Sequence, residues 1–307
     1  IDSNDQNPYN NIRNWDGDKR RRYQLVETEM GRGMKKRVCL KGGYKMLVPR
    51  YYENLSILHE NTMPTRAYYI PASKRMDDLV EHRENSDRIQ FLNGTWKFKY
   101  FESIYDVTEA FYEEGFSTEG FSDTKVPGVW QMDGYDNHQY TNIKYPFPFD
   151  PPFVPQDIPC GEYVYEFEYE KSEKTPKTYL NFEGVDSCFY VWLNGKYVGY
   201  SQVPHATSEF DVTELIKEGN NKIAVLVMKW CDGSYLEDQD KFRMSGIFRD
   251  VYLLKRPEKA VRDYRVNTVV KDNKATISLD VMFTANTEVK VVLEDKDGNT
   301  VSEKEIA

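Results

Sequence analysis

Hydrophobic and polar side chains alternate over several short stretches in the middle of the chain. These stretches cover residues 96–101, 163–169, 178–182 and 248–254. A period of two places every second side chain on the same face of a sheet, so each stretch predicts a strand. A nearly continuous apolar run within residues 221–230 predicts a central strand.

Turn signals separate the predicted strands. Asn194-Gly195 lies between the β-rich runs 188–193 and 196–200. This dipeptide favours a tight hairpin because both turn residues need positive φ. Helical signals are few: residues 211–216 predict one turn, and residues 103–112 predict a short helix.

The last fifty residues carry the same strand signals. Residues 275–283 alternate, and residues 289–294 and 300–306 flank the turn sequence Asp-Lys-Asp-Gly-Asn. Many short strands with Gly, Pro and Asn turns predict an all-β chain, with a jelly-roll sandwich as its main domain. Residues 258–307 are too few for a second sandwich of about 100 residues, so we expect them to be the start of one.

Two loops carry most of the candidate chemistry. Residues 142–159 contain six prolines among aromatic residues, which predicts a stiff, extended segment that shapes a ligand cleft or braces another domain. Residues 232–240 are rich in carboxylates. They are either solvated, or ligands for a cation or for sugar hydroxyls.

Composition narrows the classes of partner. The chain is 39% hydrophobic and 30% charged, with a net charge of −9. This charge excludes nucleic acid and an anionic membrane surface as main partners, because both need a basic surface. The longest aliphatic run, residues 223–228, is too short to span a bilayer. Cys39, Cys160, Cys188 and Cys231 form no CxxC pair and, with no secretory signal, predict free thiols in the cytoplasm.

Residues 1–45 differ from the rest of the chain. They contain eleven Lys/Arg and six Asp/Glu, a net charge of +5, and show no apolar periodicity. This composition predicts disorder, with a basic arm as the functional alternative. A further hypothesis is that Met46 is the true start and that residues 1–45 are upstream sequence read in frame. The expected layout is then an extended segment at 46–90, the jelly roll at 91–257 and the partial sandwich at 258–307.

No catalytic constellation is found in the sequence. Phosphate-binding, zinc-protease and nucleophile-elbow motifs are absent, and the four histidines are isolated from one another. We therefore predict no catalytic residue in this chain.

Several loop motifs together resemble the sugar-binding domain of glycoside hydrolase family 2. They include residues 92–98 (LNGTWKF), 126–132 (VPGVWQM), 140–146 (YTNIKYP), 151–155 (PPFVP) and 194–201 (NGKYVGYS). The longest match, residues 230–251, resembles large bacterial β-galactosidases more than the glucuronidases or mannosidases of the family. The resemblance extends over roughly residues 50–307.

The resemblance implies a galactose-binding-domain-like jelly roll, then an immunoglobulin-like sandwich, then a TIM barrel with two catalytic glutamates of a retaining mechanism. That barrel needs about 250 further residues, so this chain alone is expected to be inactive. The expected substrates are terminal β-D-galactosides such as lactose, and relatives are often homo-oligomers. The alternative is a stand-alone, non-catalytic carbohydrate-binding or assembly module.

The resemblance also assigns roles to individual positions. Asn142 matches an asparagine that hydrogen-bonds the sugar, and Asp240 matches an aspartate that binds the galactosyl unit and a sodium ion. Gln202, Asp232 and Asn54 match members of a secondary magnesium site, although Tyr51 stands where an aspartate is expected. Na⁺ and Mg²⁺ are therefore the cofactors expected for the full enzyme.

Overall fold

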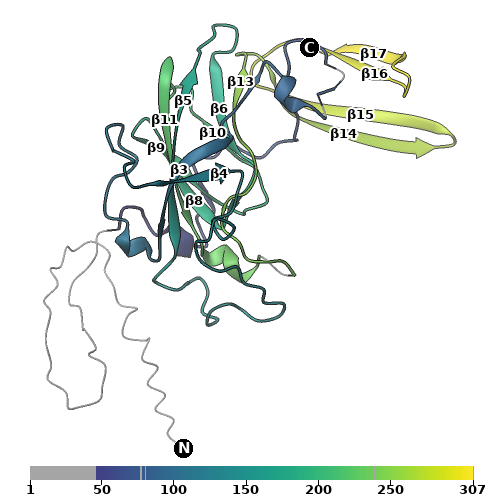
Figure 1. The fold of residues 1–307 in the computed structure, drawn as a ribbon. Coiled ribbons are helices and arrows are strands. Elements are labelled where there is room, and N and C mark those ends of the chain that lie inside the picture. The colour runs from purple at the N-terminus through teal and green to yellow at the C-terminus, as the bar shows by residue number, and fades with distance from the viewer. Residues whose placement is uncertain (1–45, 77, 80, 238–239, 307) are drawn as a thin grey trace, which may run out of the picture. The chain divides into compact units, whose positions relative to one another are not determined.

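The computed structural model describes residues 46–306 except 77, 80, 238 and 239 (Figure 1). The segment 1–45, predicted to be disordered or upstream sequence, lies outside the described residues, as does Cys39. Residues from Val48 onward form one unit. The described helices are four short 3-10 helices: η2 (Tyr51–Glu53), η3 (Arg83–Asn85), η4 (Ile104–Asp106) and η5 (Asp232–Tyr235).

Two antiparallel sheets form the sandwich (Figure 1). The larger has seven strands in the order β1 (His59–Glu60), β9 (Lys196–Gln202), β8 (Cys188–Leu193), β11 (Gly219–Met228), β5 (Cys160–Tyr169), β3 (Gly94–Phe101), β4 (Ser122–Val126). The smaller has four, in the order β10 (Ser208–Asp211), β6 (Lys177–Phe182), β13 (Val251–Arg256), β2 (Ile89–Phe91). β7 (Val185–Asp186) pairs with β12 (Gly246–Ile247). The predicted all-β sandwich is confirmed.

The strongest local signals predicted their elements correctly. Asn194 and Gly195 have φ values of 52° and 76° and join β8 to β9, as a tight hairpin requires. Residues 211–216 contain the expected single turn, closed by a bond from Ile216 N–H to Val212 O of 2.9 Å. The short helix predicted at 103–112 was wrong, because η4 ends at Asp106 and the next residue, Val107, is β-branched and in an extended conformation.

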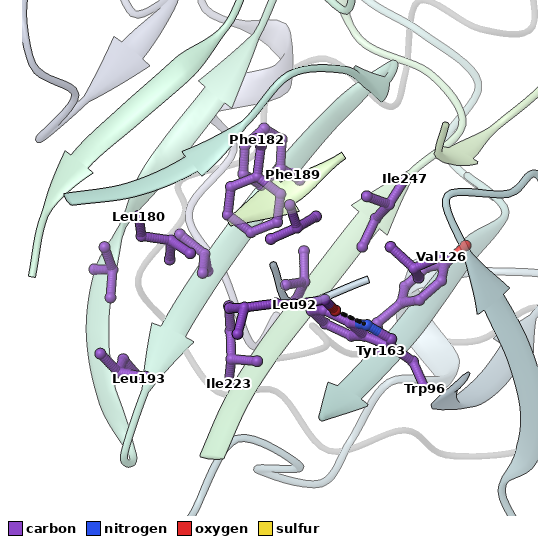
Figure 2. Close-up of a cluster of buried hydrophobic side chains, with 14 of the residues drawn as sticks. Leu92, Trp96, Val126, Tyr163, Leu180, Phe182, Phe189, Leu193, Ile223 and Ile247 are labelled. Atoms are coloured by element: carbon purple, nitrogen blue, oxygen red, sulfur yellow. Dashed lines mark hydrogen bonds between the residues drawn. The ribbon is translucent and has the colours of Figure 1, made fainter. Parts of the chain in front are cut away.

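The hydrophobic core fills the space between the two sheets. Figure 2 shows Trp96 and Tyr163 from the larger sheet near Val126 and Ile247, and Phe182 of the smaller sheet beside Phe189. Leu180 of the smaller sheet belongs to the same cluster. Trp96 is fully buried, and its Nε1–H donates to Leu92 O at 2.8 Å (dashed line in Figure 2). This bond satisfies the indole N–H, so the ring packs without leaving a buried donor unpaired.

Two hairpins occupy the region predicted to begin a second sandwich. β14 (Val261–Lys271) pairs with β15 (Lys274–Phe283), and β16 (Val289–Glu294) pairs with β17 (Thr300–Ile306). The sequence patterns predicted β15, β16 and β17, but β14 was missed because its apolar positions alternate poorly. None of the described helices is long and apolar enough to cross a membrane. Cys160, Cys188 and Cys231 are buried free thiols.

A buried carboxylate connects three separate parts of the chain. Glu209 on β10 accepts hydrogen bonds from Arg66 Nη2 at 2.9 Å and from Arg262 Nη1 of β14 at 2.8 Å. All three side chains are 10% exposed or less. Burial alone would raise the pKa of Glu209, but the hydrogen bond and charge of Arg66, together with Arg262, outweigh it and hold the pKa below its ordinary value.

We expect the Glu209→Gln substitution to destabilise the protein by about 3–5 kcal/mol at pH 7, because two buried guanidinium groups lose their counter-charge. A carboxyl with a lowered folded-state pKa stabilises the fold above its unfolded-state pKa. The difference between wild type and variant should therefore shrink as the pH falls below about 4. Urea unfolding across this pH range measures it. The exposed Glu119→Gln is the control, and equal stabilities of the two variants at pH 7 would contradict the assignment.

Glu162 should make the stability of the fold depend on pH in the opposite direction. It is 2% exposed on β5, and burial raises its pKa to about 8, although the charge of Lys99 on the neighbouring strand acts to lower it. The folded state therefore retains a proton that the unfolded state loses above pH 4.3 or so, and stability should fall between about pH 4 and pH 8. Glu162→Gln should remove this loss, gaining on the order of 1–3 kcal/mol at pH 8.5 and nothing at pH 4. Equal gains in urea unfolding at both pH values would refute it.

Candidate functional site

Two long loops leave the larger sheet at the same end of two neighbouring strands. Residues 127–159, between β4 and β5, are the first loop, and residues 229–245, between β11 and β12, are the second loop. β5 and β11 are antiparallel, with Met228 opposite Cys160, so the second loop begins where the first loop ends. The backbone N–H of Lys229 donates to Pro159 O at 2.9 Å. Strand order therefore brings the two loops together.

The base of the first loop is anchored in the core. Trp130 is fully buried and stacks on Phe98 of β3, with ring centroids 6.3 Å apart. This packing requires glycine at position 161, because a Cβ there would lie 2.4 Å from Phe98 Cε2 and 3.3 Å from Trp130 Cε3. The chain thus enters the first loop from a rigid support.

A buried ion pair holds the middle of the first loop. Lys229, the first residue after β11, donates from Nζ to Asp136, and the two side chains are 5% and 16% exposed. The same ammonium lies 5.0 Å from the centroid of the Trp230 ring. A buried ammonium needs such a counter-charge because desolvation alone would be costly.

Backbone hydrogen bonds join the two loops directly. Arg243 N–H donates to Gln139 O at 2.7 Å, and Gln139 N–H donates to Arg243 O at 3.4 Å. Closer to the base, Trp130 N–H donates to Ser245 O at 3.0 Å. These backbone hydrogen bonds hold the first and second loops against each other.

The proline-rich part of the first loop packs on the second loop through Tyr235. The Tyr235 hydroxyl donates to Phe153 O and accepts from Asp150 N–H at 3.2 Å. The rings of Phe147 and Phe149 stand nearly perpendicular to the Tyr235 ring, at 5.2 and 5.5 Å. The predicted stiff segment is thus held against a neighbouring loop of the same domain.

Asn142 and Asp240 lie on the exposed parts of these loops. Asn142 follows the Gln139–Arg243 bridge by three residues in one loop, and Asp240 precedes it by three in the other. Three residues span at most about 10 Å, so both positions lie near the bridge. Asp240 has a φ of 58°, a left-handed conformation that aspartate tolerates better than most residues. Asp238 and Gln239 lie outside the described residues.

Exposed aromatic side chains lie next to the Gln139–Arg243 bridge. Tyr140 and Phe242 are 53% and 54% exposed, with ring centroids 5.8 Å apart, and His138 meets Phe242 edge-on at 5.0 Å. Aromatic faces and carboxylate or amide groups on one surface are the combination that suits a ligand with both C–H faces and hydroxyl groups.

Gln202 of β9 contacts Asp232 of the second loop. Gln202, the last residue of β9, donates from Nε2 to Asp232 Oδ1 at 2.7 Å, while its Oε1 accepts from the Tyr200 hydroxyl at 2.6 Å. Asp232 is 4% exposed, and its Oδ2 is buried without a hydrogen-bond partner. Burial raises the pKa of Asp232 above its ordinary value, although the hydrogen bond from Gln202 acts against this. An unpaired buried carboxylate oxygen fits a cation ligand.

Asn54 does not join this pair in the structure. It is exposed at the end of η2, and its Oδ1 accepts from Ser56 N–H at 3.1 Å. Tyr51, at the position where an aspartate is expected, donates its hydroxyl to Glu60 Oε1 at 3.0 Å. Within the described part of the chain, no three His, Cys, Asp or Glu residues come close enough to hold a metal ion.

Sequence reasoning missed the residues that hold the loops: Lys229, Tyr235 and Arg243. A lysine directly after a buried apolar strand is the one local signal for Lys229, because a buried cation needs a partner. Tyr235 and Arg243 donate hydrogen bonds to main-chain carbonyl groups, and every residue has such a group, so the sequence does not indicate these contacts.

Comparison with known proteins identifies the family. The profile described as "Glycosyl hydrolases family 2, sugar binding domain" matches residues 89–257. The chain is 47% identical over 240 residues to a β-galactosidase of Actinobacillus pleuropneumoniae and 48% identical over 237 residues to one of Staphylococcus xylosus. These matches cover 78% and 77% of this chain, which spans 23% of the length of each relative.

Solved structures show the same fold at lower identity. A β-glucuronidase of an uncultured Clostridium species matches with a TM-score of 0.52 and 23% identity, over 72% of this chain and 38% of that one. A β-glycosidase from Bacteroides vulgatus matches with a TM-score of 0.55 and 22% identity, over 71% and 27%. With the profile match across both loops and the sandwich that supports them, the chain belongs to glycoside hydrolase family 2, of which it contains the sugar-binding domain.

Proposed function

We propose that this chain is the N-terminal, sugar-binding part of a β-galactosidase that hydrolyses terminal β-D-galactosides such as lactose. The observation that carries the proposal is the identity of 47–48% to β-galactosidases over more than three quarters of the chain. The catalytic groups, two glutamates of a retaining mechanism, belong to a TIM barrel further along the full protein. This chain supplies no catalytic residue.

In this proposal the two loops complete the sugar pocket of the barrel. Asn142 donates or accepts a hydrogen bond with the galactosyl unit, and Asp240 accepts from its hydroxyl groups. The exposed apolar residues of the loops, including Ile143 and Phe149 at 87% and 65% exposure, then face the barrel rather than water. The anchored bases and the paired loops support this role, because a pocket wall must hold its contacts in place.

Two cations belong to the same proposal. Asp240 is exposed and offers a carboxylate to a sodium ion beside the sugar. Asp232 offers its unpaired Oδ2 to a magnesium ion, and Gln202 would become an oxygen ligand if its amide turned its oxygen from the Tyr200 hydroxyl toward Asp232. When bound, each cation supplies positive charge that fixes the loop carboxylates. The full enzyme is proposed to be a cytoplasmic homo-oligomer.

The test of the pocket role is co-expression of this chain with the barrel-containing remainder of the enzyme, assayed with a chromogenic β-galactoside. We expect activity from the pair. Asn142→Ala should lower kcat/KM by about 10- to 100-fold, the loss of one or two hydrogen bonds to the sugar. Asp240→Asn should lower kcat/KM similarly and flatten the dependence of KM on sodium concentration.

Matched controls are the exposed Asn220→Ala and Asp280→Asn, which lie on strands away from both loops. An inactive pair, where the uninterrupted enzyme is active, would count against the pocket-completing role. A sodium response unchanged in Asp240→Asn would remove Asp240 from the sodium site. Binding of galactosides by this chain alone, without any barrel, would favour the stand-alone module.

The magnesium assignment is tested by thermal unfolding of this chain with and without MgCl₂. A cation that binds only the folded state at 100 times its Kd stabilises it by about 2.7 kcal/mol, so the Tm should rise by several degrees. Asp232→Asn should abolish the rise and Asp280→Asn should preserve it. The same rise in Asp232→Asn as in wild type would show that magnesium binds elsewhere.

A further inference from the structure

Arg243 stands out because its main chain and its side chain bind different loops. We propose that Arg243 is a positioning residue: it locks the first and second loops into one unit, so that Asn142 and Asp240 keep a fixed spacing. The role of Asn142 and Asp240 in sugar binding rests on the function proposed above. The claim that Arg243 holds the two loops together rests only on the contacts of Arg243.

The main chain of Arg243 holds the first loop. Its N–H donates to Gln139 O at 2.7 Å, and its carbonyl oxygen accepts from Gln139 N–H at 3.4 Å. This two-way bridge is isolated and belongs to no longer strand. A single antiparallel bridge has little stability of its own, so its geometry depends on what fixes the two residues.

The side chain of Arg243 holds the second loop. Nη1 donates to Ser234 O at 3.1 Å, inside η5, and Nη2 donates to Glu237 O at 3.2 Å, just beyond η5. The residue is 6% exposed. These carbonyl groups lie at the C-terminal end of a helical turn, where they lack helical partners and where a positive charge is favourable. The guanidinium thus closes the turn that leads to Asp240.

The planar fork of arginine is needed for these contacts. The two carbonyl groups are three residues apart and are reached by two different nitrogens of one rigid group. A lysine ammonium is a single point with flexible reach, so it can bond one of the two but does not fix their spacing. Burial of the charged group makes both bonds necessary, because a lost partner leaves a desolvated donor.

Lys229 holds the first loop by a separate contact. Its ion pair with Asp136 fixes that loop to the first residue after β11, at the base of the second loop, and does not involve Arg243. Loss of Arg243 should therefore release the outer parts of the two loops, beyond the bridge, while the base stays in place. This local pattern separates a positioning residue from one that merely stabilises the fold.

Hydrogen exchange of the 307-residue chain tests the inference without any enzyme assay. In Arg243→Ala we expect amide exchange in residues 137–145, 234–237 and 240–243 to accelerate at least about tenfold, with β8 and β11 unchanged. Arg243→Lys should show a smaller acceleration in the same residues and keeps the test valid if the alanine variant fails to fold. Arg249→Ala is the control, because Arg249 is exposed and lies four residues beyond the end of the second loop.

Exchange in these loops equal to that of the control in both variants would overturn the inference. Exchange that rises equally in β11 would also overturn it, because Arg243 would then serve the whole fold. In the co-expressed enzyme, Arg243→Lys should raise KM for the β-galactoside by more than it lowers kcat. No activity with the wild-type chain would count against the proposed function while leaving the exchange result intact.

Discussion

The pairing of β5 with β11 is the constraint on which the site depends. Ten residue pairs join these strands in the middle of the larger sheet, and the last pair sets Met228 opposite Cys160. Both faces of β11 are buried from residue 221 to 228, and a shift by one residue would move every side chain to the other face and replace all of its packing contacts. The fixed register in turn fixes where the two loops leave the sheet. The ion pair of Lys229 and the bridge at Arg243 then add contacts between loops that are already adjacent.

Local patterns were enough to predict most of this fold. Alternation at residues 163–169 and the Asn194-Gly195 turn each predicted an element that the structure contains. The failures have local causes as well. Residues 103–112 have helical spacing of Val107 and Phe111, both buried, but packing against the sandwich uses them in irregular backbone. Tertiary contacts outweigh weak helical propensity in such short segments.

The site was only partly predictable, for a different reason. Asn142 and Asp240 could be named because their surrounding motifs resemble a family, whereas nothing in their own chemistry distinguishes them from other loop residues. The contacts that hold them join distant positions: Asp136 and Lys229 are 93 residues apart, and Gln139 and Arg243 are 104 apart. Neither pair can be recognised before the order of strands is known. A single sequence contains the partners but not their proximity.

The aromatic excess of the chain also has a structural explanation. Aromatic residues make up 14% of the sequence, and several of the largest, including Trp96, Phe98 and Tyr163, are packed between the sheets. Side chains packed as closely as in other protein interiors leave no room for a sugar between the layers. A ligand contact must therefore come from the loops, where Tyr140 and Phe242 remain exposed. The loops can hold such residues in place because Trp130 and Tyr235 are buried beneath them, so the same residue type builds both the support and the surface.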